Sequence, residues 1–293
     1  MPQVHKSGFV SIVGRPNVGK STLMNKLVGE NLSIITSKAQ TTRHRIMGIL
    51  SGDDFQVVYS DTPGLLEPKY ELQKKMMSFV QVSLEDADLI LLVVELEEKY
   101  DKALFERISH IQTPIFLVIN KIDLAKGSQL EDKISYWKEQ LKVKEIIPVS
   151  AITGKNVDRL FKMILENIPQ HPAYYPKDDV TDKNERFFAS EIIREKIFLN
   201  YSQEIPYSSE VSIDEFKDEE KIIKIRAIIY VERDSQKGIL IGKGGASLKK
   251  VGTEARKDLE TFFDKQVFLE THVKVAENWR KQKQRLKQFG YSE

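Results

Sequence analysis

Apolar runs recur through the first half of the chain. They occupy residues 8–13, 55–60, 88–94, 114–119 and 145–149. The runs at 88–94 and 114–119 are continuous rather than alternating, which is typical of strands covered on both faces in a parallel sheet. Residues 21–28 instead carry apolar side chains at helical spacing. The pattern predicts an α/β fold with a doubly wound, mostly parallel sheet.

The second half has a different order of elements. Residues 187–199 have the pattern of an amphipathic helix, and two strand-like runs follow at 208–216 and 221–231. A helix is then expected over 248–262, with its apolar face at positions 248, 251, 255, 259 and 262. A last strand is expected at 266–275. This order predicts a separate α+β domain.

The segment between these two patterns, residues 168–184, contains three prolines and little periodicity, which is typical of a linker. A chain of 293 residues is long enough for two domains, each with its own core. We therefore predict a first domain at 1–168, a linker at 169–184 and a second domain at 185–293 that ends in a basic tail. His171 is expected to be a solvated linker residue, since no metal-ligand spacing surrounds it.

A glycine-rich stretch between the first strand and the first helix fits the phosphate-loop spacing Gly-x-x-x-x-Gly-Lys-Ser/Thr. In this setting backbone N–H groups close on the phosphates, and the helix N-terminus adds positive potential. Lys20 is expected to reach the β- and γ-phosphates, and the hydroxyl of Ser21 to bind Mg²⁺. The predicted nucleotide contacts are Gly14, Arg15, Pro16, Asn17, Val18, Gly19, Lys20, Ser21 and Thr22.

Two polar segments after the loop fit nucleotide-sensing switches. The first, residues 30–45, contains Thr41 and Thr42, and a threonine there can bind Mg²⁺ through its hydroxyl and sense the γ-phosphate through its N–H. The second begins where a predicted strand ends, at Asp61, which is placed to hold Mg²⁺ directly or through water. Gly64 can bring its N–H close to the γ-phosphate because it has no Cβ.

The residue after Gly64 is Leu65, where many related switches have a glutamine that orients the attacking water. An apolar side chain cannot position water by hydrogen bonding. Another group must do so, or hydrolysis is slow until a partner or a cation helps. The predicted chemistry is attack of water on the γ-phosphate without a covalent intermediate, with Lys20, Mg²⁺ and backbone amides stabilising the charge.

The sequence Asn-Lys-Ile-Asp after the strand at 114–119 selects the base. Asp123 can accept hydrogen bonds from N1–H and the 2-amino group of guanine, and adenine lacks this pair of donors. The nucleotide is therefore predicted to be GTP or GDP rather than ATP. Asn120 either holds guanine O6 or ties loops together, and the stem of Lys121 can cover the ring. The backbone at Ser150 and Ala151 is expected to complete the base pocket.

A Gly-x-x-Gly turn at 242–245 opens the long helix of the second domain. Such a turn lets a nucleic-acid backbone pass closely, as in KH domains, where it clamps four nucleotides. Four lysines and no acid lie between positions 237 and 250, which favours RNA binding over a plain helix connection. The predicted RNA contacts are Lys237, Ile241, Gly242, Lys243, Gly244, Gly245, Lys249 and Lys250.

The C-terminal tail is also basic. Six basic residues and one acid lie between Lys274 and Lys287, so we expect phosphate contacts with a strong salt dependence. Trp279 either stacks on a base or anchors the tail on the core of the domain.

Composition narrows the class of protein. A hydrophobic content of 41% with 30% charged residues is typical of a globular protein, and no apolar run approaches the length of a bilayer span. The N-terminus leads into the first strand without room for a signal peptide, so we expect a cytoplasmic location. Zero cysteines exclude disulfides, thiolate metal sites and a cysteine nucleophile. The net charge of +2 requires any nucleic-acid surface to be local.

Residues 8–168 resemble the translation-factor-like GTPases. Within them, the sequences at 14–21 and 38–43 are similar to those of the Era family. The order of elements in the second domain resembles the second KH type, so the resemblance covers essentially the whole chain. It implies that Thr42 is the switch threonine, with Thr41 as its rival, and that Asn17 is a candidate ligand for K⁺. Leu65 agrees with the family, whose members also have an apolar residue there.

The resemblance further implies a GTPase with Lys20, Thr42 and Gly64 in catalysis and Mg²⁺ held by Ser21, Thr42 and Asp61. Its expected role is a molecular switch that binds small-subunit ribosomal RNA near its 3′ end and acts in small-subunit assembly. The expected cofactors are GTP or GDP, Mg²⁺ and K⁺. The expected partners are this RNA and the 30S-type subunit, with the chain as a monomer. Peripheral contact with the inner face of the plasma membrane is left open.

Two alternative functions remain. The first is an RNA-binding assembly chaperone in which the nucleotide is mainly structural. The second is another GTPase of the same superfamily, such as one linked to tRNA modification, and the C-terminal Gly-x-x-Gly module argues against it.

Overall fold

The computed structural model describes residues 5–102, 105, 108 and 111–291. The chain divides into two units. The first contains residues 1–69 and 73–182, and the second contains residues 70–72 and 183–293. In the described ranges, no helix is long and apolar enough to cross a membrane.

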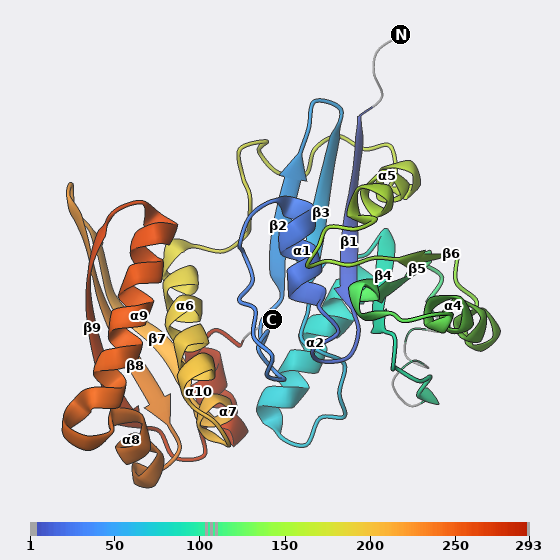
Figure 1. The fold of residues 1–293 in the computed structure, drawn as a ribbon. Coiled ribbons are helices and arrows are strands. Elements are labelled where there is room, and N and C mark those ends of the chain that lie inside the picture. The colour runs from blue at the N-terminus through green and yellow to red at the C-terminus, as the bar shows by residue number, and fades with distance from the viewer. Residues whose placement is uncertain (1–4, 103–104, 106–107, 109–110, 292–293) are drawn as a thin grey trace. The chain divides into compact units, whose positions relative to one another are not determined.

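The first unit is built on a sheet that is six-stranded in the part of the chain that the structure describes (Figure 1). Its strands are β1 (Lys6–Val13), β2 (Ile46–Ser51), β3 (Phe55–Asp61), β4 (Leu89–Glu95), β5 (Ile115–Asn120) and β6 (Glu145–Pro148). Its helices include α1 (Lys20–Val28), α2 (Glu71–Glu85), the short η1 (Ile122–Leu124), α4 (Gln129–Gln140) and α5 (Val157–Asn167). The strand order is β2-β3-β1-β4-β5-β6.

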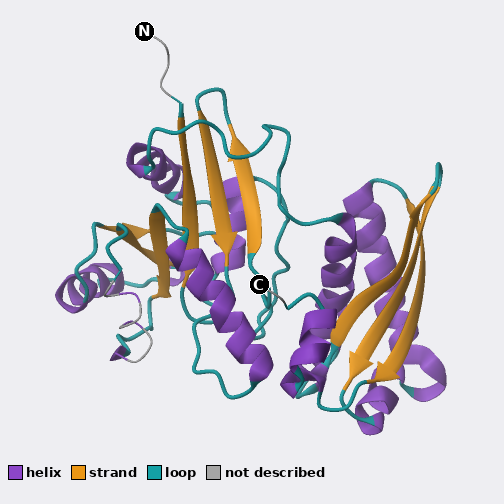
Figure 2. Ribbon diagram, turned by 180° about the vertical axis from the view of Figure 1, so that it is seen from behind, coloured by secondary structure: helices purple, strands orange, loops and turns teal. Residues whose placement is uncertain are grey.

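All neighbouring strands of this sheet are parallel except β2, which is antiparallel to β3. Figures 1 and 2 show α1 on one face of the sheet and α2 on the other. Both faces are covered, so β4 is buried at every residue except Glu95. The structure therefore confirms a doubly wound, mostly parallel sheet, with β2 as an antiparallel edge strand that the apolar runs did not predict.

The parallel order brings three loops to one edge of the sheet. The loops after β1, β3 and β5 all leave the carboxyl ends of their strands, and β1 lies between β3 and β4. In open α/β sheets, ligands bind at this edge, where neighbouring loops diverge. The strand order alone thus places the predicted phosphate loop, second switch and base loop at the same edge of the sheet.

The segment predicted as a linker is bound to the first unit along most of its length. Gln170 forms an isolated bridge with Lys6. Further along, the buried side chain of Gln56 on β3 accepts hydrogen bonds from the N–H groups of Tyr174 (2.7 Å) and Tyr175 (3.0 Å). The same side chain donates to the carbonyl oxygen of Tyr175 at 2.9 Å. We call residues 169–182 the strap.

The end of the strap pairs with the free edge of β2 through an isolated bridge and two flanking hydrogen bonds. The N–H of Ile49 donates to the carbonyl oxygen of Val180 at 2.9 Å. Thr181 forms an antiparallel bridge with Gly48, and the N–H of Met47 donates to Asp182 Oδ1 at 3.0 Å. Most of the segment expected to connect the domains is therefore part of the first unit, while the exact domain boundaries stay a prediction.

The second unit is a three-stranded sheet with helices, again counted over the described residues (Figure 2). Its elements are α6 (Glu185–Asn200), α7 (Ile205–Ser208), β7 (Glu210–Asp218), β8 (Ile222–Val231), α8 (Asp234–Ile241), η2 (Lys243–Gly245), α9 (Ala246–Phe263), β9 (Gln266–Val275), η3 (Trp279–Lys281) and α10 (Lys283–Gln288). Strand β8 is central, antiparallel to β7 and parallel to β9. Figures 1 and 2 show α6 and α9 on the same face of this sheet.

The core of the second unit lies between α6, α9 and the sheet. The predicted apolar face of α9 is confirmed in the middle of the helix, where Val251, Ala255 and Leu259 are fully buried. Phe262 is 40% exposed instead, although its ring lies 5.1 Å from that of Phe188. Phe262 lies in the last turn of the helix, just before Asp264, whose left-handed backbone conformation ends it.

Candidate functional site

The phosphate loop, residues 14–19, joins β1 to α1. Lys20 is the first residue of α1, and its Nζ donates to the carbonyl oxygens of Gly14 (3.2 Å) and Arg15 (2.9 Å). The side chain is almost completely buried, and this burial lowers the pKa of Lys20 to about 8. A nearby anion stabilises a buried ammonium group. Nucleotide phosphates would therefore further stabilise the charged form of Lys20 and raise its pKa again.

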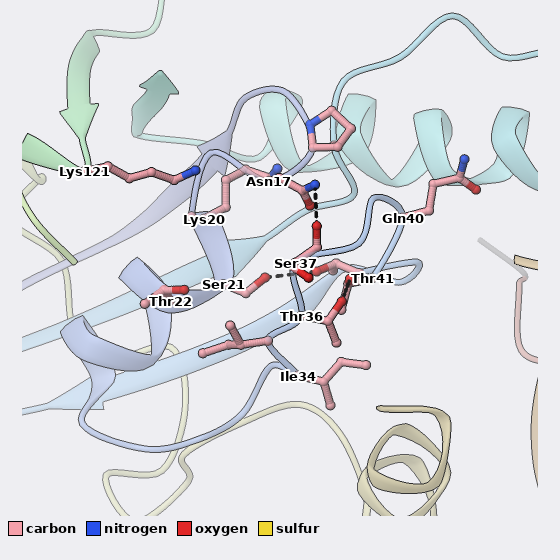
Figure 3. A pocket seen from close by; sticks show the side chains of 15 residues that line it. Asn17, Lys20, Ser21, Thr22, Ile34, Thr36, Ser37, Gln40, Thr41 and Lys121 are labelled. Carbon is pink, nitrogen blue, oxygen red and sulfur yellow. Dashed lines mark hydrogen bonds between the residues drawn. The ribbon is translucent and has the colours of Figure 1, made fainter. Parts of the chain in front are cut away.

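A pocket of about 500 Å³ opens beside this loop (Figure 3). It is lined by the phosphate loop and the start of α1, by residues 34–37 and 40–42 of the first switch, by Gly64 and by Lys121. Figure 3 shows Thr36, Ser37 and Thr41 on the side of the pocket opposite the phosphate loop. Polar groups from the loop and from the predicted switch therefore face one space.

Three side-chain oxygen atoms from separate segments meet at the start of α1. Ser21 Oγ donates to Asp61 Oδ2 at 2.7 Å and lies 3.0 Å from Thr42 Oγ1, which in turn lies 3.3 Å from the same carboxylate oxygen. Asp61 Oδ1 is buried and has no hydrogen-bond partner among the described residues. Burial raises the pKa of Asp61. Mg²⁺ binds hydroxyl and carboxylate oxygens and would offset the cost of burying this carboxylate, so the residues fit the cation.

The two neighbouring threonines of the first switch point in different directions. Thr41 Oγ1 donates to the carbonyl oxygen of Lys38 at 2.7 Å and lies 2.6 Å from Thr36 Oγ1. Of the two, Thr42 is the one whose hydroxyl lies beside Ser21 Oγ, as described above. The geometry therefore favours Thr42 over Thr41 as the metal-binding threonine, and this role stays a prediction.

Asn17 links the phosphate loop to the first switch. Its backbone is left-handed, with φ of 66°, a conformation that asparagine adopts more readily than most residues. Its Nδ2 donates to the carbonyl oxygen of Ser37 at 2.9 Å (Figure 3). This bond uses the NH₂ group, whereas a cation such as K⁺ would bind the amide oxygen.

Asn120 ties two loops together. Its Nδ2 donates to the carbonyl oxygen of Val18 at 2.9 Å, and its Oδ1 accepts from the N–H of Ala151 at 3.0 Å. Of the two roles that the sequence left open for Asn120, the structure shows the loop-tying one. The phosphate loop and the base loop are therefore fixed to one another.

The other base-loop residues lie next to this joint. Asp123 Oδ1 accepts a hydrogen bond of 2.5 Å from Ser150 Oγ, which orients the carboxylate. Lys121 has a left-handed backbone, with φ of 61°, and its Nζ pairs with Glu95 Oε2 at 2.6 Å. The structure thus brings Asp123, Ser150 and Lys121 into one neighbourhood, and their contacts with guanine stay a prediction.

The second switch approaches the phosphate loop closely. A Cβ on Gly64 would lie 2.6 Å from the backbone nitrogen of Pro16, so only glycine fits there without a shift. The N–H of Leu65 donates to the carbonyl oxygen of Gly14 at 2.9 Å, and the leucine is 3% exposed. The position where other switches carry a water-orienting glutamine is therefore an inward-packed apolar side chain.

The side chain of one predicted nucleotide contact, Arg15, is held by acids outside the pocket, while contact of its backbone with the phosphates stays a prediction. The side chain of Arg15 does not line the pocket. Its Nη2 pairs with Asp101 Oδ2 at 2.6 Å, and its Nε lies 3.3 Å from Glu98 Oε1. Residues 95–102, which hold Arg15, were not predicted as part of the site, although a run of acids at the carboxyl end of a buried strand is a signal in the sequence.

The Gly-x-x-Gly turn joins α8 to α9. Gly242 has φ of 72° and ψ of 175°, and a Cβ there would lie 2.2 Å from Ser247 Oγ. Gly244 and Gly245 also have positive φ. Around the turn, Lys243, Lys249 and Lys250 are exposed and Lys237 and Ile241 are half-buried. The predicted RNA contacts are thus gathered on one loop and the adjoining helix ends.

Trp279 anchors the basic tail. Its side chain is fully buried, and Nε1 donates to the carbonyl oxygen of Ser208 at 2.9 Å, so it is not available to stack on a base. Tyr291, beyond α10, is also buried, and its hydroxyl donates to Glu210 Oε2 at 2.7 Å. The exposed basic side chains of the tail are Lys274, Lys281, Lys283, Arg285 and Lys287.

Known proteins with both parts of this architecture are similar along the full chain. A family model described as 50S ribosome-binding GTPase matches residues 9–121, and a KH domain model matches residues 204–280. The GTPase Era of Staphylococcus haemolyticus is 44% identical over 293 residues, which is 99% of this chain and 98% of that protein. The chain belongs to the Era family of GTPases. The resemblance at 14–21 and 38–43 and the prediction of a GTPase are thereby confirmed.

Two solved Era structures have the same fold. A variant of Aquifex aeolicus Era bound to GDP·AlF4⁻ matches with a TM-score of 0.94 and 38% identity, covering 98% of this chain and all of that one (100%). Era in complex with MgGDPNP and nucleotides 1506–1542 of 16S ribosomal RNA matches with a TM-score of 0.93 and 38% identity, covering 99% of this chain and 100% of that one. The GTPase fold followed by a KH domain is therefore shared with the Era family.

Proposed function

We propose that this Era-family GTPase is a switch that binds small-subunit ribosomal RNA near its 3′ end through its KH domain and acts in small-subunit assembly. The observation that carries the proposal is the meeting of Ser21, Thr42 and Asp61, because it joins the phosphate loop to both predicted switches. The exposed lysines around the Gly-x-x-Gly turn support RNA as the ligand of the second domain.

The choice of RNA follows the relative that matches the whole chain. The Era complex holds nucleotides of 16S RNA, which belongs to the small subunit. The family model for residues 9–121 is named for the 50S subunit, but it spans only part of the first unit. We therefore propose small-subunit RNA and the 30S-type subunit as partners. The exposed basic side chains of the tail are expected to add phosphate contacts that weaken with salt.

In the proposed mechanism, Lys20 binds the β- and γ-phosphates and the N–H of Gly64 approaches the γ-phosphate. Ser21, Thr42 and Asp61 would hold Mg²⁺, which when bound neutralises charge on the phosphate oxygens. Asp123 selects guanine. Because Thr42 belongs to the first switch, loss of the γ-phosphate would release this segment after hydrolysis.

Leu65 cannot orient the attacking water, so hydrolysis needs help from another group, and a cation that adds positive charge at the phosphates is one such source of help. We propose that Asn17 binds K⁺ through its amide oxygen, next to the phosphates. Turnover is then expected to be higher in potassium than in sodium buffers at equal ionic strength, and to lose this difference in Asn17→Ala. Equal turnover of the unmodified protein in both cations would contradict this role.

The proposed switch is tested by coupling the two activities. Hydrolysis is expected to rise on addition of RNA that carries the 3′ end of the small-subunit RNA, and RNA affinity is expected to differ between the GTP-bound and GDP-bound forms. The alternative is an assembly chaperone with a structural nucleotide. A Lys20→Ala protein that binds the RNA and still supports subunit assembly would favour that alternative.

The proposal also includes a cytoplasmic monomer with residues 1–168 as the GTPase domain and 185–293 as the RNA-binding domain. Sedimentation of the purified chain tests the monomer. Fractionation of cells tests the location, and protein released from the inner face of the plasma membrane by salt would indicate peripheral contact.

A further inference from the structure

The segment that begins at the last residue of β4, residues 95–102, contacts both loops of the proposed nucleotide site. Glu95 pairs with Lys121 of the base loop at 2.6 Å. Glu98 and Asp101 pair with Arg15 of the phosphate loop. A cleft of about 780 Å³ lies between this segment and the back of the phosphate loop, where it is lined by Pro16 and Val18 as well.

The same segment is fixed from its other side by α4. The side chain of Lys133 donates to the carbonyl oxygen of Glu98. The N–H of Tyr100 donates to the hydroxyl of Tyr136 at 2.8 Å. Residues 98–101 are therefore a supported platform, so the ion pairs with Arg15 act on the phosphate loop from a fixed base.

Arg15 transmits this support to the phosphate-binding lysine. Its side chain pairs with the two acids, while its carbonyl oxygen accepts a hydrogen bond of 2.9 Å from Lys20 Nζ. Arg15 thus connects the two acids to Lys20, the side chain proposed to bind the phosphates. A shift of the Arg15 backbone would move the carbonyl oxygen on which Lys20 is positioned.

Burial makes Arg15 and Glu98 depend on one another. The side chain of Glu98 is only 4% exposed, whereas the side chain of Arg15 is 38% exposed. Burial raises the pKa of Glu98 to about 7, and the charge of Arg15 acts in the opposite direction. Loss of Arg15 would remove the positive charge that holds down the pKa of Glu98, so the buried carboxyl group would favour its neutral form and the ion pair that anchors the phosphate loop would be lost.

We propose that Glu98, together with Asp101, is a positioning residue that holds the phosphate loop in its nucleotide-receiving conformation through Arg15. The inference rests on the proposed nucleotide site. Neither acid lines the pocket in which the phosphates would lie. The loop holds the phosphates before and during hydrolysis alike, so loss of the clamp weakens binding in both states and leaves kcat nearly unchanged.

The test is a double-mutant cycle on the full chain, read out as release of a fluorescent GDP analogue in the presence of Mg²⁺. Arg15→Ala and Glu98→Gln are each expected to speed release about tenfold, and the double variant no more than the faster single variant, since one contact is lost in all three. Glu97→Gln is the matched control, because Glu97 is an exposed acid of the same segment.

Additional variants separate positioning from folding. Asp101→Asn removes a partly exposed partner and is expected to speed release with an unchanged melting temperature. Arg15→Lys keeps the charge and is expected to restore part of the slow release lost in Arg15→Ala. Wild-type release rates in both Glu98→Gln and Asp101→Asn, or fully additive effects in the cycle, would overturn the proposal. Failure of the unmodified chain to bind the GDP analogue would instead overturn the proposed function.

Discussion

Asn120 illustrates how single side chains prepare the nucleotide site. Both ends of its amide bind backbone groups, the carbonyl oxygen of Val18 and the N–H of Ala151. A site whose loops are already connected loses less entropy when a ligand binds. The specificity of the site then depends on neighbouring groups, above all the carboxylate of Asp123.

Base selection gives a direct test at this scale. Asp123→Asn replaces an acceptor with an amide, which can donate to the 2-carbonyl of xanthine but cannot accept from both donors of guanine. GTP affinity is expected to fall about 100-fold, and xanthosine triphosphate is expected to become the preferred nucleotide. Competition titrations with both nucleotides measure the change. Unchanged GTP affinity would contradict the role of Asp123.

The two threonines of the first switch form a matched pair. Thr42→Ala removes a hydroxyl that lies 3.0 Å from Ser21 Oγ, so hydrolysis is expected to fall about tenfold and to need more Mg²⁺. Thr41→Ala removes a hydroxyl that bonds to Thr36 and Lys38 rather than to Ser21, and is expected to have the smaller effect. Single-turnover hydrolysis over a range of Mg²⁺ concentrations distinguishes the two. The reverse order of effects would assign the metal to Thr41.

At the scale of elements, the apolar runs predicted most of the framework. Strands β1, β3, β4, β5 and β6 each begin within a residue or two of a predicted run. Strands covered on both faces are rich in apolar residues, as β4 and β5 are, whereas the short edge strand β6 is buried only at Ile147. Strand β2 was missed. It is a short edge strand with Gly48 in its middle, it follows a switch without periodicity, and its free edge is covered by the strap rather than by a helix.

The site was predictable where it is encoded by short motifs, and not where it depends on tertiary contacts. The phosphate loop, Asp61 and the base loop can each be recognised from the residue types and their spacing in the sequence. The partners of Arg15 do not, because Glu98 and Asp101 reach it only after β4 is placed beside β1. The spacing left Thr41 and Thr42 as alternatives; the family resemblance favoured Thr42, and the direction of its side chain supports that choice.

The Gly-x-x-Gly turn allows a prediction about a single element. Gly242→Ala would force a Cβ to within 2.2 Å of Ser247 Oγ and would strain a backbone at φ of 72° and ψ of 175°. The local distortion is expected to cost about 1–3 kcal/mol and to weaken RNA binding at least about tenfold. Filter binding or fluorescence titration with the 3′-end RNA measures this.

A second glycine of the same region serves as its control. Gly252 lies inside α9, where a Cβ would meet nothing closer than 3.9 Å. Gly252→Ala is expected to leave RNA affinity unchanged and to raise the free energy of unfolding by about 0.5–1 kcal/mol. Wild-type RNA affinity in Gly242→Ala would remove the turn from the RNA-binding site.

At the scale of the whole molecule, the strap links the first switch to the start of the second unit. Strand β2 begins directly after the switch, and its second residue, Met47, holds Asp182. A change in the switch can thus reach the end of the strap through a single short strand. This contact lies within the first unit and involves no nucleotide-binding residue.

The strap can be weakened without touching either binding site. Asp182→Ala removes the side-chain acceptor of the Met47 N–H and is expected to reduce the difference in RNA affinity between the GTP-bound and GDP-bound forms. Asp179→Ala, at an exposed position of the same segment, is the control and should retain the difference. RNA titrations in both nucleotide states measure it. An undiminished difference in Asp182→Ala would exclude the strap as the connection.

The strap also sets the length of the tether between the two activities. Only Lys183 separates Asp182 from Asn184, whose side chain caps α6. If residues 170–182 detached, these 13 residues and Lys183 would form a free tether of 14 residues that could span at most about 50 Å. Effective concentration falls steeply as a flexible tether lengthens beyond the distance it must bridge. If the proposed ribosomal particle is bound by both domains, the strap would regulate the avidity of that binding even with every contact to the particle unchanged.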